Sequence, residues 1–112
     1  GKLRAMTGLS DQDRDLLRRF EARVREALPG RVDRVVAFGS RARGDHEEDS
    51  DLDAAVFVQG ELQRQDRDAV YHAGYQLLRE QGVMIQPLLF PARAWDEDSF
   101  LLRNIRGDAV AA

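Results

Sequence analysis

The sequence predicts an α+β (α/β) domain in which a short mixed β-sheet packs against helices. Segments with helical apolar spacing alternate with short β-branched segments in the order α-β-β-α-β-α. The 112 residues are 43% hydrophobic and 33% charged, which supplies a core for one domain and argues against intrinsic disorder. We therefore expect a single domain over residues 10–110. Residues 1–9 form an N-terminal extension that resembles, in part, an expression remnant.

The first predicted helix begins after Ser10 and ends before the Pro29–Gly30 pair. Ser10 is a typical N-cap residue, and the carboxylates of the first turn complement the helix dipole. Residues 31–38 are apolar and β-branched and predict the first strand. Residues 39–50 are polar, acidic and punctuated by glycine, which indicates a loop or a single helical turn. The apolar face of the first helix comprises Leu16, Leu17, Phe20, Val24, Ala27 and Leu28.

Residues 52–58 predict the second strand, and residues 61–80 predict a helix with apolar residues on one side. Gly74 lies in the middle of this helix, where glycine costs about 1 kcal/mol relative to alanine. Tyr71 and Tyr75 are four residues apart, so they would lie on one helical face and help to pack it.

Residues 83–90 predict the third strand, in which Pro87 indicates a sheet edge or a bulge because proline has no N–H to donate. A last helix should follow the corner formed by the next few residues. Asp98 or Ser99 would cap its start, and Gly107 would be its C′ residue.

Composition excludes several classes of protein. The absence of cysteine excludes disulfide scaffolds, thiolate zinc sites and cysteine nucleophiles, and His46 and His72 are too few and too far apart to indicate a zinc site. The net charge of −3 argues against direct nucleic-acid binding by the chain as a whole. Apolar runs are shorter than a membrane span needs and no secretory signal is evident, so we expect a cytoplasmic protein that does not bind membranes.

The most informative stretch is Gly39-Ser40, followed after ten residues by Asp51-Leu52-Asp53. Glycine allows a ligand to approach the backbone closely, and a strand that turns through Gly-Ser presents N–H groups and a hydroxyl that can bind phosphate. Asp51 and Asp53 are two residues apart at the start of a strand, so both carboxylates should point from one face. Two such carboxylates suit Mg²⁺, whose other ligands are water and phosphate oxygens. Arg41 and Arg43 flank the Gly-Ser turn, where an arginine could steady a phosphate.

The pattern Gly39-Ser40-x10-Asp51-x-Asp53 resembles the signature of the DNA polymerase β-like nucleotidyltransferase superfamily. The short chain is similar to its minimal nucleotidyltransferases, which are antitoxins of HEPN/MNT toxin–antitoxin pairs. This resemblance implies the small nucleotidyltransferase fold, ATP as substrate and Mg²⁺ as cofactor. It implies that Gly39 and Ser40 hold the triphosphate and that Asp51 and Asp53 are the catalytic, metal-binding residues. The implied partner is a HEPN-domain ribonuclease toxin, which receives AMP on a tyrosine.

One departure from the superfamily pattern concerns a third acidic residue, which usually lies on the later strand. Here the strand around residues 83–90 contains no carboxylate, and Gln86 or Met84 takes the expected place. An amide cannot act as a general base. Three explanations remain open: slower chemistry, an acid supplied by the segment 45–49, or a domain that binds nucleotide without transferring it.

Three functions are therefore compared. The first is a protein adenylyltransferase antitoxin. The second is a catalytically weak or inactive antitoxin of the same fold, which neutralises its toxin by binding and which the missing third carboxylate favours. The third is a small-molecule nucleotidyltransferase of the antibiotic-modifying type. It would need an acceptor-binding region that 112 residues do not accommodate unless a partner supplies it.

Overall fold

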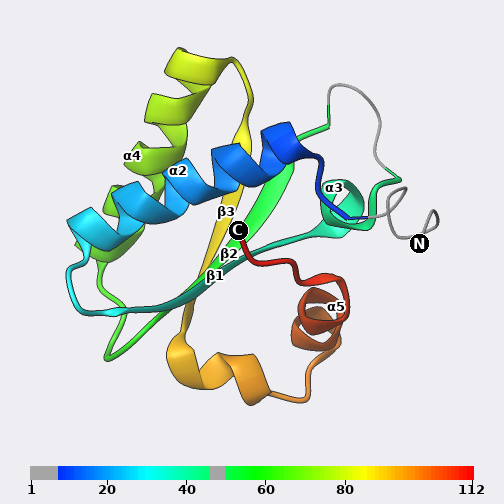
Figure 1. Ribbon diagram of the computed structural model, residues 1–112. Helices are drawn as coiled ribbons and strands as arrows, with labels where there is room; N and C mark the ends of the chain where they lie inside the picture. The colour runs from blue at the N-terminus through cyan, green and yellow to red at the C-terminus, as the bar shows by residue number, and fades with distance from the viewer. Residues whose placement is uncertain (1–7, 46–49) are drawn as a thin grey trace.

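The computed structural model describes residues 8–45 and 50–112 (Figure 1). The predicted alternation of helices and strands is confirmed, with a short helix directly after the first strand. The elements are α2 (Asp11–Ala27), β1 (Val32–Phe38), α3 (Gly39–Arg43), β2 (Leu52–Val58), α4 (Arg64–Gln81), β3 (Ile85–Pro91), the 3-10 helix η1 (Ala92–Asp96) and α5 (Phe100–Asp108).

The three strands form a mixed sheet with the order β1-β2-β3. β1 and β2 are antiparallel, whereas β2 and β3 are parallel and are joined through α4. β3 therefore lies at an edge of the sheet, which confirms the expectation raised by Pro87. The α+β class predicted from the sequence is correct, and the mixed pairing leaves β2 in the centre.

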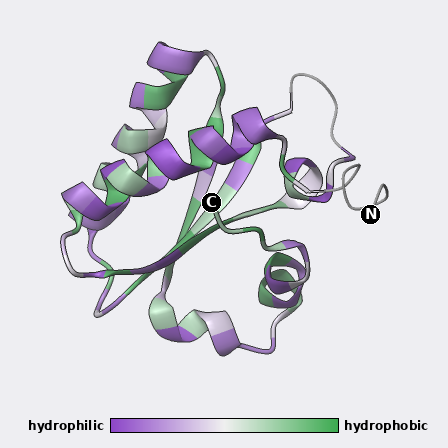
Figure 2. Cartoon of the chain, in the orientation of Figure 1, coloured by the Kyte–Doolittle hydropathy of each residue, from purple (hydrophilic) through white to green (hydrophobic). Residues whose placement is uncertain are grey.

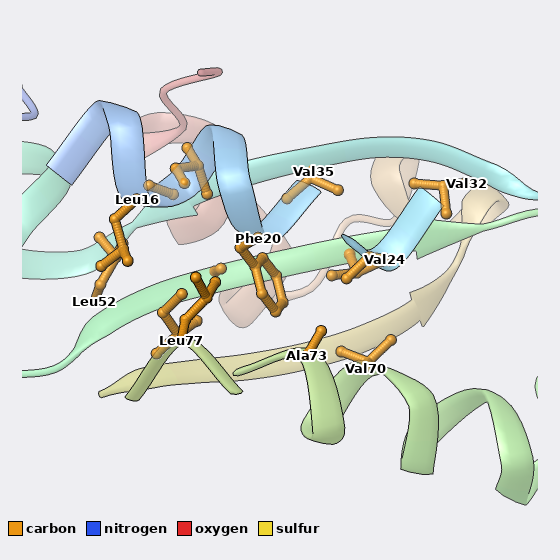
Figure 3. Packing of buried hydrophobic residues seen from close by; sticks show 14 of the residues in the cluster. Leu16, Phe20, Val24, Val32, Val35, Leu52, Val70, Ala73 and Leu77 are labelled. Carbon is orange, nitrogen blue, oxygen red and sulfur yellow. The ribbon is translucent and has the colours of Figure 1, made fainter. Parts of the chain in front are cut away.

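Helices α2 and α4 cover one face of the sheet and form the larger core (Figures 1 and 3). Hydrophilic and hydrophobic residues alternate along both helices, as expected where one side of a helix is buried (Figure 2). Gly74 is buried where α4 approaches β3, and a Cβ added there would lie 3.5 Å from the Ile85 carbonyl oxygen. That distance is an ordinary van der Waals contact, so the packing of α4 on β3 does not by itself require a glycine here.

The other face of the sheet carries η1 and α5 over a smaller core. Phe57 is fully buried there and meets the ring of Trp95 edge to face, with 5.3 Å between ring centroids. The Arg34 guanidinium lies 3.9 Å from the centre of the Trp95 ring. Leu102 and Ile105 are the residues through which α5 is buried. No helix among the described residues is long and apolar enough to cross a membrane.

The predicted helix starts are confirmed at both ends of the chain. The Ser10 hydroxyl accepts from the Asp13 N–H at 3.0 Å, and the Ser99 hydroxyl accepts from the Leu102 N–H at 3.1 Å. The prediction for Gly107 was wrong, because α5 continues through Asp108 and Gly107 does not adopt a positive φ.

Two predictions for the α4 region also require correction. The helix begins at Arg64 rather than residue 61, because Gln63 and Asp66 form a capping box that fixes its start. Tyr71 and Tyr75 do not pack the helix, since they are 46% and 56% exposed. α4 is instead buried through the smaller residues Val70, Ala73 and Gly74, together with Leu77.

Candidate active site

The two halves of the sequence motif meet between β1 and β2. Phe38, the last residue of β1, pairs with Asp53 in antiparallel register, so Gly39 follows beside the Asp53 side chain. A Cβ added to Gly39 would lie 2.5 Å from Asp53 Oδ2, and the φ of Gly39 is +79°. Any larger residue would therefore be strained and would clash with the carboxylate. The sequence predicted that a ligand would approach the backbone of Gly39 closely. In the structure, the side chain of Asp53 lies there.

Asp51 and Asp53 lie on either side of Leu52, which is fully buried. Asp51 is exposed just before β2, and Asp53 is half-buried within the strand. Burial raises the pKa of the Asp53 carboxyl above its ordinary value; the Asp51 charge raises it further, and the Arg43 charge opposes both. The charge of Arg43 therefore does not fully offset burial and the repulsion between the two carboxylates, and a divalent cation bound to them would.

The acidic pair fits a metal that binds together with a phosphate ligand. Within residues 8–45 and 50–112, no three Asp, Glu or His side chains gather closely enough to hold a metal ion. Mg²⁺ needs only one or two protein carboxylates when substrate phosphates and water supply the remaining oxygens. Asp51 and Asp53 are the residues that would hold it, and the ion would supply positive charge against the phosphates.

The residue beside Asp53 on the neighbouring strand is Gln86. β2 and β3 pair in parallel with Asp53 opposite Gln86, and the Gln86 side chain is exposed. Met84 lies just before β3 and is 44% exposed. Of the two candidates from the sequence, Gln86 is thus the one that lies in register with Asp53.

The acidic segment before Asp51 is described only at its start. His46, Glu47, Glu48 and Asp49 lie outside the described residues, so the suggestion that this segment supplies an acid stays a prediction. Asp45 is exposed, and the Arg43 Nε donates to its carboxylate at 3.1 Å.

Arg41 has a structural connection that the sequence did not reveal. Its Nη1 donates to both carboxylate oxygens of Asp13 at 2.8 and 3.0 Å, and the two side chains are only 11% and 5% exposed. Its Nε also donates to the Ser50 carbonyl at 2.7 Å. Arg41 therefore ties the start of α2 to the segment that leads into Asp51. Asp13 was expected only to complement a helix dipole, and no local signal pairs it with α3.

Asp108 is a second residue that sequence reasoning missed. The Gly39 N–H donates to Asp108 Oδ2 at 3.3 Å, and Arg43 Nη1 donates to the same oxygen at 2.8 Å. Hydrogen bonds to Asp45 and Asp108 raise the pKa of Arg43. Because Asp108 is 69 residues away from Gly39, only the fold reveals that it belongs to the site.

An open hollow of about 300 Å³ borders Asp51 on the side of α4 and β3. Its wall is partly apolar, and the partly exposed Met84 belongs to it. This provides space for part of a substrate next to the acidic pair. The described residues that line the hollow are Arg41, Ser50, Asp51, Leu78, Gly82, Val83 and Met84.

Comparison with known proteins points to one family. The family model of the nucleotidyltransferase domain matches residues 17–92, which include both halves of the motif. The chain is 25% identical over 76 residues to "Putative protein adenylyltransferase MJ0141" of Methanocaldococcus jannaschii, covering 68% of this chain and 77% of that protein. It is 32% identical over 73 residues to "Putative protein adenylyltransferase MJ0604" of the same organism, covering 65% and 68% of the two chains.

Proposed function

The chain belongs to the nucleotidyltransferase domain family, and we propose that it is a Mg²⁺-dependent protein adenylyltransferase. In this proposal it transfers AMP from ATP to a tyrosine of a cognate HEPN ribonuclease toxin and thereby acts as the antitoxin. The similarity to two proteins named as protein adenylyltransferases supports the class of acceptor. The observation that carries the proposal is the contact between Gly39 and Asp53, which joins a phosphate-binding turn to an acidic pair.

Each motif residue has a distinct task in this function. The Gly39 N–H and the Ser40 hydroxyl bind oxygens of the triphosphate. Asp51 and Asp53 hold Mg²⁺, which neutralises charge on the phosphates when bound. Arg41 holds the segment before Asp51 in place through its contacts with Asp13 and the Ser50 carbonyl.

The transfer itself is a displacement at the α-phosphorus of ATP. The tyrosine oxygen forms a bond to that phosphorus while the bond to the β-phosphate oxygen breaks, and pyrophosphate leaves. The phenolic proton passes to solvent, because Gln86 beside Asp53 cannot accept it. A phenol suits such a site, because its pKa of about 10 is low for a hydroxyl and a nearby cation lowers it further.

A second candidate function also rests on Gln86. Gln86 gives β3 an amide where a base would be expected, so a protein that neutralises its toxin by binding alone is the alternative. The two functions differ in one observable consequence. Only the enzyme changes the covalent mass of the toxin.

The test begins by identifying a HEPN-domain gene that adjoins the gene for this chain. The two proteins are then co-expressed, and the HEPN-domain protein is examined by intact mass spectrometry. We expect added AMP units on the toxin with the wild-type chain and none with the Asp51→Asn/Asp53→Asn variant. Peptide mapping should place the addition on tyrosine. If both proteins neutralise the toxin equally and its mass stays unchanged, the enzyme proposal fails and the binding function replaces it.

A further inference from the structure

The carboxylate of Asp108 is the centre of an anion-binding arrangement at the candidate active site. Oδ2 accepts from the Gly39 N–H of α3 and from the Arg43 guanidinium, at 3.3 and 2.8 Å. A backbone N–H and a guanidinium that converge on one charged oxygen form the kind of arrangement that binds a phosphate oxygen. The acid that satisfies them here comes from the last residue of α5, and its side chain is 22% exposed.

The same N–H cannot serve Asp108 and a triphosphate at once. A phosphate oxygen that approaches Gly39 would also meet the negative charge of Asp108, in addition to the charges of Asp51 and Asp53. We propose that Asp108 occupies the place of a triphosphate oxygen, so that nucleotide binding exchanges this carboxylate for phosphate on Gly39 and Arg43. This inference rests on the proposed function and adds a means by which the chain itself limits access to the site.

The surrounding contacts allow the exchange without unfolding. Beyond α5 the chain is held by two backbone hydrogen bonds between Ala37 and Val110, at 2.9 and 3.0 Å. The Asp108 side chain can therefore rotate away while the C-terminal segment stays on β1. The Arg43 side chain is 47% exposed, and once released it can reach a phosphate. Arg43 then changes from a partner of Asp108 to a ligand of the nucleotide.

A role for Asp108 as a third metal ligand is the competing explanation. If Asp108 were a metal ligand, replacing it with asparagine would weaken the binding of metal and nucleotide. The exchange predicts that the same replacement strengthens nucleotide binding. The structure favours the exchange, since Asp108 does not gather with Asp51 and Asp53 into a metal-holding group in the described part of the chain.

The experiment compares wild type, Asp108→Asn and the control Asp98→Asn by calorimetry, with tripolyphosphate and with ATP, each in excess Mg²⁺. Asp98 precedes α5, is 84% exposed, and pairs with Arg103 at 3.5 Å, so the control removes the same charge at the other end of the helix. We expect Asp108→Asn to bind both ligands about tenfold more tightly, a factor that corresponds to the loss of one competing interaction. Asp98→Asn should bind like wild type.

The outcomes separate this inference from the proposed function. Equal affinity of wild type and Asp108→Asn overturns the exchange, and weaker binding by Asp108→Asn assigns the residue to the metal site instead. Tighter binding without AMP transfer to the toxin supports the exchange and counts against the transferase. If neither wild type nor Asp108→Asn binds either ligand, alone or in complex with the toxin, both proposals fail.

A measurement on the wild-type protein covers the case in which the variant does not fold. In nuclear magnetic resonance spectra, the Gly39 amide and the Arg43 Nε–H signals should both shift as tripolyphosphate and Mg²⁺ are added. Binding that moves neither signal would overturn the exchange.

Discussion

Gly39 is the residue at which the candidate site depends on the absence of a side chain. Its positive φ and the 2.5 Å separation between an added Cβ and Asp53 Oδ2 exclude any other residue without rearrangement. Burial, followed by the charge of Asp51, raises the pKa of the Asp53 carboxyl that packs against Gly39. The apo site is therefore formed at a cost to stability, which is common where charged groups are assembled for function.

The first prediction concerns the acidic pair without metal. Asp51→Asn/Asp53→Asn should fold with a melting temperature in EDTA equal to that of wild type or slightly higher, because two crowded charges are removed. The native pKa of Asp53 is raised, so the folded protein holds this proton more tightly than the unfolded chain. The ionised group therefore lowers the wild type's stability as pH rises from about 4, the pKa of an unfolded aspartate, through the native pKa.

Thermal melts at several values between pH 4 and pH 7 check this sign. The melting temperature of the double variant minus that of wild type should grow over the interval and then level off. A large drop in the variant's melting temperature in EDTA would instead show that the acidic pair holds the fold together.

For individual residues, the sequence predicted which ones form the motif, but it did not predict which residues they contact. The spacing selected Gly39, Ser40, Asp51 and Asp53 as candidates, because phosphate and metal binding restrict which residue types can serve. The contact of Gly39 with Asp53 requires the register that pairs Phe38 with Asp53, and this register is a property of the sheet.

Helix α3 shows how two arginines of one short element acquire different roles. Arg41 faces inward to the buried Asp13, whereas Arg43 faces the site and is 47% exposed. A buried carboxylate left without its partner is costly, whereas exposed ion pairs contribute little to stability.

The second prediction uses this contrast. Arg41→Met should destabilise the protein by about 3 kcal/mol, because Asp13 would stay buried without its arginine. Arg43→Met should change the unfolding free energy far less, because the ion pairs of Arg43 are exposed to solvent. Denaturant unfolding of the three proteins measures both values.

The comparison also tests the role of Arg41 expected from the sequence. If Arg41→Met unfolds like wild type but loses affinity for ATP and Mg²⁺, Arg41 acts on the phosphate and its ion pair with Asp13 contributes little. A loss of stability on the predicted scale supports the structural role.

For helices and strands, the sequence predicted the helix starts that depend on neighbouring residues. Ser10 and Ser99 cap their helices as expected, because a cap depends on neighbouring residues. One failure was local, since the capping box of Gln63 and Asp66 starts α4 later than the apolar spacing suggested. Another lies where a distant part of the chain intervenes. Tyr71 and Tyr75 have the spacing of a packed face but stay exposed, because α4 approaches the sheet through smaller residues that include Gly74.

In the whole molecule, the candidate site draws on every strand of the described sheet and on α5, which covers one of its faces. Gly39 follows β1, Asp53 lies in β2, Gln86 in β3 and Asp108 at the end of α5. The mixed order of strands brings these residues together from separate segments. Asp108 could not be inferred from the sequence, because nothing within its own segment marks it as a partner of Gly39.

This assembly leads to the last prediction, which concerns stability in the presence of ligand. ATP with Mg²⁺ should raise the melting temperature of wild type, because a ligand that binds only the folded state stabilises it. At about 100 times the dissociation constant the stabilisation is about 2.7 kcal/mol, or roughly 10 °C for a domain of this size. Mg²⁺ alone should have a smaller effect, since the acidic pair would lack the phosphate oxygens that complete its coordination.

The requirement for metal follows from the charges at the site. ATP carries several negative charges into a region that already contains Asp51, Asp53 and Asp108, so without a cation repulsion should prevent stable binding. ATP in EDTA should therefore leave the melting temperature unchanged, as should ATP and Mg²⁺ with Asp51→Asn/Asp53→Asn. An equal rise with and without EDTA would contradict the metal assignment. If ATP has no effect on this chain in any buffer, the measurement must be repeated on its complex with the toxin, and no effect there would contradict the nucleotide site itself.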